Sequence, residues 1–222
     1  MTSKNPLKPL QKNPNPKMNK QEKATKIISG LKKLFPSPEI ALNYSNPIEL
    51  LIAVVLSAQT TDKQVNVVTA DLFKKYQTIK DYINTPLPEF EQDVKRIGLY
   101  RGKAKNIKSA LEIIDKEYHG KIPDSMEELI KLPGVGRKTA NVLLYNIYEK
   151  PEGIALDTHV RRLSNLFGLT TNQDPDKIER DLMEIVPKKE WGEITYLLID
   201  YGRAYCPAHC KHTDCPLRSF IA

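Results

Sequence analysis

Residues 122–148 read IPDSMEELIKLPGVGRKTANVLLYNIY and carry the strongest local signal in the chain. Ser125 followed by Glu128 forms a capping-box pattern, which predicts the start of a short helix. A second helix is predicted from about Arg137. Between the two helices, Pro-Gly-Val-Gly predicts a hairpin, because its glycines can take positive φ and allow another backbone to approach. The stretch therefore predicts a helix-hairpin-helix over about 124–148.

The predicted hairpin is suited to binding a DNA phosphate. Its backbone amides and the N-terminus of the following helix point into one concavity, which binds a phosphate without reading the base sequence. The residues expected to contact DNA here are Leu132, Gly134, Val135, Gly136 and Arg137. The alternative is a tight turn between helices in a protein that never meets DNA, because short motifs also occur by chance.

The rest of the chain also predicts helices. Apolar residues recur at helical intervals from Lys20 onward, and breaks rich in proline and glycine divide the pattern into segments of ordinary helix length. The two-residue alternation typical of strands is not sustained anywhere. The prediction is an all-α protein of about ten helices.

Positive charge is unevenly distributed along the chain. Residues 1–17 hold four lysines, four prolines and no acid, so they are predicted to be a disordered basic tail. Without these lysines the formal net charge falls from +7 to +3. Two other acid-free segments, residues 99–108 and 131–138, hold four and three cations. Both are candidates for a DNA-facing surface, although solvated basic faces are common.

The composition argues against a membrane protein and a secreted protein. No apolar run approaches the roughly 18 residues of a membrane span, and the N-terminus lacks the apolar stretch of a secretory signal. All three cysteines lie between Cys206 and Cys215, whereas a secreted disulfide framework spreads an even number along the chain. We therefore expect a cytoplasmic protein whose cysteines are candidate metal ligands.

Four segments occur in an order and spacing that resemble the endonuclease III family. They are LLIAVVLSAQTTD at 50–62, IGLYRGKAKNI at 97–107, LPGVGRKTANVLL at 132–144 and ALDTHVRR at 155–162. The resemblance implies a DNA glycosylase of base-excision repair that also cuts the strand at the abasic site it makes. It further implies double-stranded DNA as the partner and oxidised pyrimidines as the substrates. We expect a monomer, associated with the nucleoid in a prokaryote.

The resemblance also implies two helical domains with a DNA-binding cleft between them. Residues 40–150 would form a six-helix domain that ends in the helix-hairpin-helix. Residues 18–39 would pack with residues 151–222 in a second helical domain. Catalytic residues from the two domains would then face each other across the cleft.

Two residues match the catalytic pair of the family. The lysine after the hairpin is the family's nucleophile and the aspartate of the Asp-Thr-His segment is its partner, which here are Lys138 and Asp157. A lysine amine can displace the base and leave an iminium at the sugar C1′, which acidifies the C2′ hydrogens for β-elimination of the 3′ phosphate. The attacking amine must be deprotonated, so we expect its pKa to lie below the reference value of about 10.4. The carboxylate can stabilise positive charge that develops on the sugar.

Simpler roles exist for these residues. Lys138 could contact only a phosphate, and Asp157 could serve only as the N-cap of the helix that follows it. In the family, a glutamine and a leucine also fill the space left by the extruded nucleotide, and the matching residues are Gln59 and Leu99. The alternatives are a polar residue at a helix end for Gln59 and an ordinary core contact for Leu99.

The C-terminal sequence CPAHCKHTDCPLRSFIA departs from the family pattern. Relatives commonly hold a [4Fe–4S] cluster with cysteines spaced C-x6-C-x2-C-x5-C, because the cube needs four ligands. With Cys206 as the first ligand and Cys215 as the third, His212 takes the second position. The fourth position falls on Ile221, which cannot bind iron.

Three interpretations of this terminus are open. The cluster could be lost and the cysteines left over, or an incomplete cube could take an outside ligand. Alternatively, Cys210 could supply a third thiolate, and a histidine could complete a Cys3His set suited to zinc. We expect loss of the standard cluster, with no cofactor required for the chemistry.

Two other functions are open at this point. A monofunctional glycosylase of the adenine or mismatch-thymine type would form no Schiff base, and Lys138 argues against it. A non-catalytic helix-hairpin-helix module would hold DNA for a partner protein and leave abasic DNA uncut.

Overall fold

The computed structural model describes residues 18–221, so the predicted tail at 1–17 lies outside the described residues. The described part contains eleven α-helices, two short 3-10 helices and no strand, which confirms the all-α prediction. None of these helices is long and apolar enough to cross a membrane. In chain order the elements are α1 (Lys20–Leu34), α2 (Pro47–Ser57), α3 (Asp62–Lys75), α4 (Ile79–Asn84), α5 (Leu87–Asp93), α6 (Tyr100–Glu117), α7 (Met126–Leu129), α8 (Arg137–Tyr148), α9 (Thr158–Leu166), α10 (Pro175–Ile185), η1 (Lys188–Glu190), α11 (Glu193–Ala204) and η2 (Arg218–Phe220).

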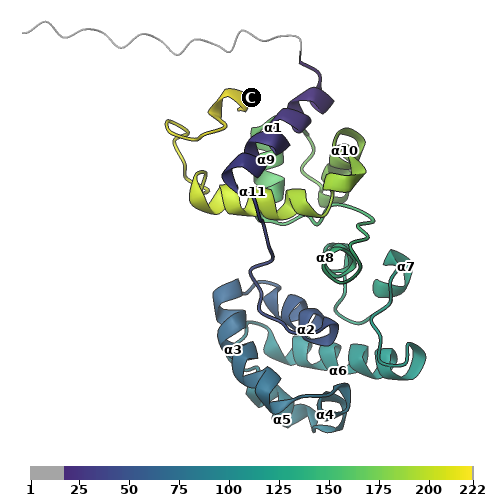
Figure 1. The fold of residues 1–222 in the computed structure, drawn as a ribbon. Coiled ribbons are helices and arrows are strands. Elements are labelled where there is room, and N and C mark those ends of the chain that lie inside the picture. Colours follow the sequence, from purple (N-terminus) through teal and green to yellow (C-terminus); the bar gives the residue numbers. More distant parts are fainter. Residues whose placement is uncertain (1–17, 222) are drawn as a thin grey trace, which may run out of the picture.

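The helices form two lobes, each with its own apolar core (Figure 1). Helices α2 to α8 form one lobe, which we call the hairpin lobe. Helices α1, α9, α10 and α11 form the other, which we call the terminal lobe because it joins the N-terminal helix to the C-terminal part of the chain. The domain boundaries expected after residues 39 and 150 stay a prediction, which these two separate cores support.

Helix α2 forms the centre of the hairpin lobe. Its start is defined by Asn46, whose side chain accepts a hydrogen bond from the Glu49 amide at 3.0 Å, and by Pro47 in the first turn. Residues 50–56 are all buried, because α3, α6 and α8 surround the helix. A helix that is apolar on every side belongs inside a core, so α2 provides a rigid support for the loop that follows it.

The terminal lobe is closed by the chain after α11. This segment turns back along α1 (Figure 1), and the Leu217 amide donates to the Tyr201 hydroxyl at 3.2 Å. Gly30 on α1 makes room for it, since a Cβ built there would lie 2.7 Å from Leu217 Cδ2. Close packing of this kind holds the cysteine-containing segment against the lobe.

The predicted helix-hairpin-helix is formed by α7, the turn after it and α8. Ser125 Oγ accepts a hydrogen bond from the Glu128 amide at 3.4 Å, so the cap expected at the start of α7 is present. Gly134 has φ of 81°, and a Cβ built on it would lie 3.0 Å from Asn106 Cβ. The turn therefore requires glycine at 134. Gly136 is the N-cap of α8 with φ of −94°, so its conformation is open to other residues.

Candidate active site and metal centre

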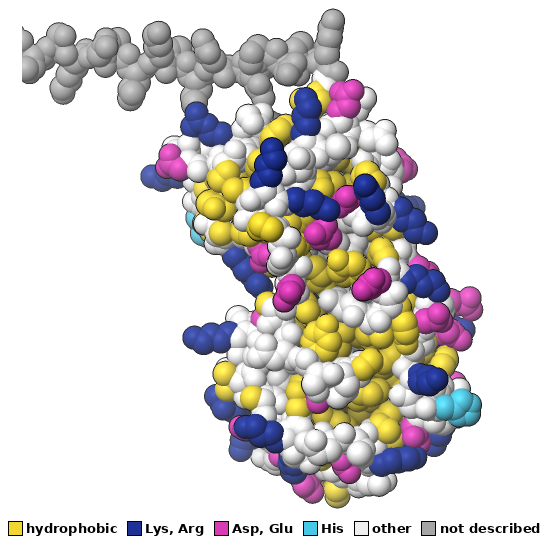
Figure 2. Space-filling model, viewed as in Figure 1, with side chains coloured by type: hydrophobic (Ala, Val, Ile, Leu, Met, Phe, Trp, Pro, Cys, Tyr) yellow, Lys and Arg dark blue, Asp and Glu magenta, His cyan; other side chains and the backbone are white. Residues whose placement is uncertain are grey.

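A cleft of about 1440 Å³ lies between the two lobes. Its lining comes from the loop after α2, the N-terminal part of α3, the first turn of α8, the start of α9 and the middle of α11. In Figure 2 the outline of the molecule narrows between the lobes. Two lysines line the cleft, Lys63 and Lys138, and Asp157 lines it as well. The structure thus brings the predicted nucleophile and its predicted partner into one cavity.

Lys138 lies in the first turn of α8, and its side chain is exposed. No side chain caps this helix, so the first amides of α8 remain available to an anion. Leu132 and Val135 are buried in the core of the hairpin lobe, so only their backbone atoms can reach a DNA phosphate. Gly134 and Gly136 are exposed and leave the hairpin backbone accessible.

Asp157 is the N-cap of α9. Its Oδ1 accepts a hydrogen bond from the Val160 amide at 2.7 Å, which fixes the orientation of the carboxylate. The cap engages Oδ1, and among residues 18–221 no hydrogen bond engages Oδ2 of this cleft-lining residue. Capping and a catalytic role are therefore compatible in this geometry.

Gln59 and Leu99 lie on two turns that pack against each other. Both have a left-handed backbone, with φ of 55° and 57°, which is uncommon for residues other than glycine. Leu99 is 68% exposed although it is apolar, and Gln59 is exposed and lines the cleft. An exposed leucine on a strained turn fits the wedge that the resemblance implies better than it fits a core contact.

Arg137, which is itself exposed, pairs with a buried carboxylate that joins the two lobes. Its Nε donates to Glu179 Oε2 at 2.6 Å, and Asn141 Nδ2 donates to Glu179 Oε1 at 2.9 Å. Glu179 is only 4% exposed, and its hydrogen bond raises the pKa of Arg137. A Cβ at Gly153 would lie 2.0 Å from Glu179 Oε1, so this position has no room for a side chain. The expected contact of Arg137 with DNA stays a prediction.

A second link crosses between the lobes at the cleft. Arg203 Nη2 on α11 pairs with Asp62 Oδ2 on α3 at 2.6 Å, and both residues line the cleft. Asn146 on α8 also donates to the Tyr196 hydroxyl at 2.6 Å, and burial raises the pKa of that phenol. Sequence reasoning did not find these pairs, because each joins residues that are at least 50 positions apart.

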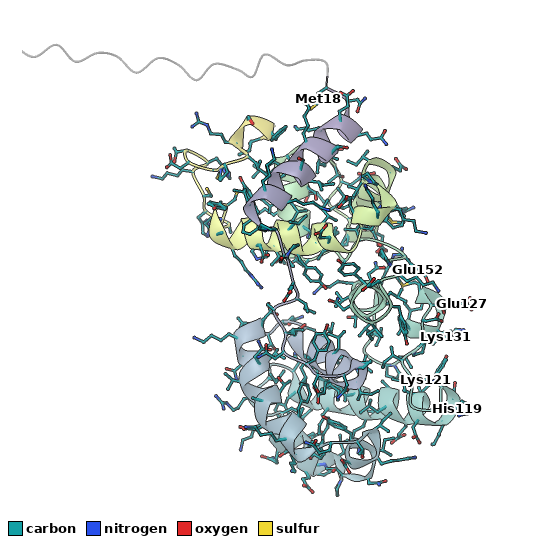
Figure 3. The ribbon with its side chains drawn as sticks, in the orientation of Figure 1. Met18, His119, Lys121, Glu127, Lys131 and Glu152 are labelled. Carbon is teal, nitrogen blue, oxygen red and sulfur yellow. The ribbon has the colours of Figure 1, made fainter. Side chains whose placement is uncertain are left out.

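Some cations of the two basic segments are already engaged by other groups of the protein. In residues 99–108, the Lys103 and Lys108 ammonium groups are bound to backbone oxygens, and Lys103 is only 7% exposed. In residues 131–138, Lys131 pairs with Glu127 at 3.2 Å at the outer edge of the hairpin lobe (Figure 3). Lys103 is therefore not available to a phosphate, although its segment is a candidate DNA-facing surface, because its ammonium group is bound inside the protein.

Neutralising Arg101 and Lys105 together is expected to weaken the salt dependence of DNA binding. Both side chains are exposed on α6, so each can release counterions from one phosphate. The slope of log K against log salt should fall by up to about two. The measurement is a duplex titration at several salt concentrations, with neutralised Lys26 and Lys33 on α1 as the control pair. Equal slopes for the two double variants would contradict this assignment.

The C-terminal cysteines gather into a metal-ligand set. The donor atoms of Cys206, Cys210, His212 and Cys215 all lie within 4.8 Å of one another. Cys210 Sγ and Cys215 Sγ are 3.3 Å apart, and His212 Nδ1 lies 3.5 Å from Cys206 Sγ. Three cysteine sulfurs and one imidazole nitrogen thus lie close enough together to hold a metal.

The expected loss of the standard cluster is wrong. Spacing taken from the family assigned the fourth ligand to Ile221, which instead packs against the core of the terminal lobe. The loop places Cys210 in the ligand set, and His212 completes the four donors with its backbone at φ of 58°. The terminus therefore forms a metal-binding site of the type at which endonuclease III holds its [4Fe–4S] cluster.

Comparison with known proteins agrees with this geometry. A family model described as HhH-GPD superfamily base excision DNA repair protein matches residues 52–188. Endonuclease III of Bacillus subtilis (strain 168) is 47% identical over 188 residues, which cover 84% of this chain and 85% of the relative. The chain belongs to the endonuclease III family. Endonuclease III of Synechocystis sp. (strain ATCC 27184 / PCC 6803 / Kazusa) is 44% identical over 190 residues, which cover 86% and 87% of the two chains.

Solved structures of endonuclease III bound to DNA have the same fold. A trapped covalent endonuclease III–DNA intermediate matches with a TM-score of 0.85 and 44% identity, covering 90% of this chain and 94% of that one. A non-covalent endonuclease III–DNA complex matches with a TM-score of 0.86 and 44% identity, covering 92% and 95%. These likenesses confirm the two-lobed fold. The protein is a DNA glycosylase and abasic-site lyase of base-excision repair.

Proposed function

We propose that this member of the family removes oxidised pyrimidines from double-stranded DNA in the cytoplasm, with Lys138 as the nucleophile and Asp157 as its catalytic partner. The observation that carries the proposal is that these residues, one from each lobe, line the same cleft. The covalent DNA intermediate of a 44% identical relative adds support, because it is the species that an amine nucleophile would form.

Lys138 acts through its free amine. The Nζ lone pair attacks C1′ of the damaged nucleotide, the bond from C1′ to the base breaks, and the base leaves with the bonding pair and gains a proton. The nitrogen then loses a proton, and its lone pair forms the iminium between Nζ and C1′ as the bond from C1′ to O4′ breaks. O4′ leaves with the bonding pair and takes up a proton to become a hydroxyl group. A C2′ proton is then removed, and the electrons expel the 3′ phosphate. Hydrolysis of the remaining imine releases the enzyme and the cut strand.

Asp157 has two proposed roles, in stabilising charge on the sugar and in transferring protons. Its carboxylate, oriented by the hydrogen bond from the Val160 amide, stabilises positive charge on the sugar as the base departs. The same group can accept a proton from the attacking amine and pass it on. The cap on α9 thereby becomes part of the pre-organised site.

The remaining contacts hold the distorted duplex. The exposed backbone at Gly134 and Gly136, with the start of α8, binds a phosphate beside the target nucleotide. Leu99 enters the base stack, and Gln59 offers a donor and an acceptor to the base that has lost its partner. The nucleotide then occupies the cleft with its sugar at Lys138.

A panel of duplexes tests this function. Thymine glycol, 5-hydroxycytosine, a mismatched uracil and a plain abasic site are each presented in the same sequence, and base release and strand cleavage are followed separately. The proposal predicts fast release of the two oxidised pyrimidines and cleavage of the abasic site. Release of adenine or mismatched thymine without strand cleavage would instead assign a monofunctional glycosylase, and no reaction would assign a DNA-binding module.

We also propose that the C-terminal site holds the iron–sulfur cluster of the family, with His212 as one of its ligands. Three thiolates and one imidazole supply the four donors that a cube needs, and imidazole replaces thiolate in other iron–sulfur centres. When bound, the cluster would supply crosslinks between the ligands and a redox centre. Arg162 lies beside the site, with Nη1 3.6 Å from Cys206 Sγ, and its charge offsets that of the thiolates.

Replacing His212 is expected to remove the metal and destabilise the terminal lobe. Protein purified without oxygen should carry about four irons and four sulfides per chain, and His212→Ala should lose most of both together with a lower melting temperature. His209→Ala is the matched control, because His209 is exposed and lies outside the ligand set. Wild-type protein without iron, or His212→Ala with its full iron content, would contradict the assignment.

A further inference from the structure

Lys103 has an unusual environment for a lysine. Its side chain is buried, and its Nζ donates to Leu56 O at 2.9 Å, to Ala58 O at 2.5 Å and to Thr60 Oγ1 at 3.1 Å. The first two acceptors belong to the C-terminal end of α2, where helix carbonyls lack partners within the helix. A cation at this end also interacts favourably with the helix dipole. Burial lowers the pKa of Lys103, because removing an ammonium group from water disfavours its charged form.

The three acceptors surround the turn that carries Gln59. Ala58 and Thr60 are its neighbours in the chain, so the ammonium group binds this turn on both sides of Gln59. Gln59 itself has φ of 55°, a conformation that the surrounding structure must hold because an isolated chain rarely adopts it. Lys103 supplies charge-assisted hydrogen bonds that do so.

The same residue is also bonded to the turn that carries Leu99. Lys103 lies in the first turn of α6, and its amide donates to Leu99 O at 3.2 Å. The two turns are in contact, since a Cβ built at Gly98 would lie 3.6 Å from both Gln59 O and Thr60 Oγ1. One residue therefore joins the two turns, through its backbone to the Leu99 turn and its side chain to the Gln59 turn. We call them the rim turns, because Gln59 lines the cleft and the Leu99 turn packs against it.

We propose that Lys103 is a positioning residue that fixes the separation and orientation of Gln59 and Leu99, so that both enter the duplex together as the damaged nucleotide leaves it. This inference rests on the proposed function of those two residues. Loss of the ammonium group removes three hydrogen bonds from the Gln59 turn without touching Lys138, Asp157 or the hairpin. A variant without this ammonium group should therefore be defective in filling the space left by the extruded nucleotide, and not in forming the bond between Lys138 and the sugar.

The chain contains a matched control for this role. Lys108 lies further along α6, and its Nζ donates to Tyr82 O, Ile83 O and Thr85 O at 2.6, 2.8 and 2.6 Å. It caps the end of α4 as Lys103 caps the end of α2, and burial lowers its pKa as well. Neither lysine lines the cleft, but Lys108 bonds to neither rim turn. Both lysines therefore bind carbonyl oxygens at the end of a helix, but only Lys103 bonds to the turns of Gln59 and Leu99.

The test compares Lys103→Met with Lys108→Met on a duplex that carries 2-aminopurine opposite an abasic analogue. Insertion of the rim residues disturbs stacking of the 2-aminopurine and changes its fluorescence. We expect Lys103→Met to reduce this change severalfold and to slow base excision from duplex DNA about tenfold or more, because small misplacements cost rate steeply. The loss of lyase activity should be much smaller on single-stranded abasic DNA, which has no gap to fill. Lys108→Met is expected to lower the melting temperature comparably and to leave the fluorescence change intact.

Two further variants separate the possible failures. Thr60→Val removes one of the three acceptors and should reduce the fluorescence change in the same direction by less, which keeps the test valid if Lys103→Met does not fold. Leu99→Ala tests the underlying function. If Leu99→Ala leaves the fluorescence change intact, the proposed wedge is wrong. If Leu99→Ala reduces it while Lys103→Met and Thr60→Val do not, or if Lys108→Met reduces it equally, the positioning role of Lys103 is wrong.

Discussion

Lys138→Gln is expected to abolish base release and strand cleavage while DNA binding persists. The substitution removes the amine that forms the bond to C1′, and the glutamine amide is not nucleophilic enough to replace it. A loss of about 10⁴-fold or more in single-turnover rate is the size expected when a covalent nucleophile is removed. Binding should weaken by less than about tenfold, because one charge is lost while the hairpin backbone and the start of α8 remain.

Lys63→Gln provides the control for this variant. Lys63 is the other lysine that lines the cleft, it is exposed, and it lies on α3 away from the hairpin. Single-turnover cleavage and duplex affinity are measured for both variants under the same conditions. If Lys138→Gln still cleaves DNA and Lys63→Gln does not, then Lys63 on α3 is the nucleophile.

Asp157→Asn is expected to slow turnover by about 10²-fold to 10⁴-fold with little change in melting temperature. Asparagine is as good an N-cap as aspartate, so the helix start that depends on the Val160 amide should be preserved. It lacks the charge that stabilises the departing sugar. The rate and the melting temperature therefore report separately on catalysis and on capping.

Asp174→Asn is the matched control for Asp157→Asn. Asp174 caps α10 through the Lys177 amide at 3.0 Å and does not line the cleft. It should change neither rate nor melting temperature appreciably. A normal rate in Asp157→Asn combined with a lower melting temperature would show that Asp157 is only a cap.

Much of the fold could be predicted from local patterns in the sequence. The apolar period marks the helices, and the glycine at 134 marks the hairpin because only glycine meets both its positive φ and its close approach to Asn106. The pairing of α1 with the C-terminal helices came from resemblance, since nothing local in residues 20–34 indicates a partner more than a hundred residues away. The spacing of apolar residues along a helix identifies the face that is buried, but it does not identify the element that packs against that face.

The site was less predictable where a residue's partners are distant in the sequence. Lys103 is part of a basic segment that predicts a solvated face, and its acceptors lie 43 to 47 positions earlier in the chain. Glu179 has no local signal either, because its partner Arg137 is 42 positions away. The number of charged residues in a segment does not show whether distant carbonyl or carboxylate groups will bind them in the folded protein.

The metal ligands show the limit of spacing as a guide. A ligand pattern transferred from the family fixes distances along the chain, whereas the ligand set depends on how the loop closes. Here the backbone is left-handed at His212 and the Cys210 sulfur lies beside the other donors, so four donors are present without a cysteine at 221. A set of three cysteines and one histidine was among the interpretations left open by the sequence, but choosing it required a backbone conformation that spacing does not encode.

The central claim is that Lys138 becomes covalently attached to DNA. Incubating the wild-type protein with an abasic duplex in the presence of borohydride should reduce the iminium and trap one strand on the protein. Digestion and mass spectrometry then locate the attached sugar. The account predicts attachment at Lys138, no trapping in Lys138→Gln and normal trapping in Lys63→Gln. Attachment at Lys63 or any other residue, or rapid strand cleavage with no trapped species, would contradict it.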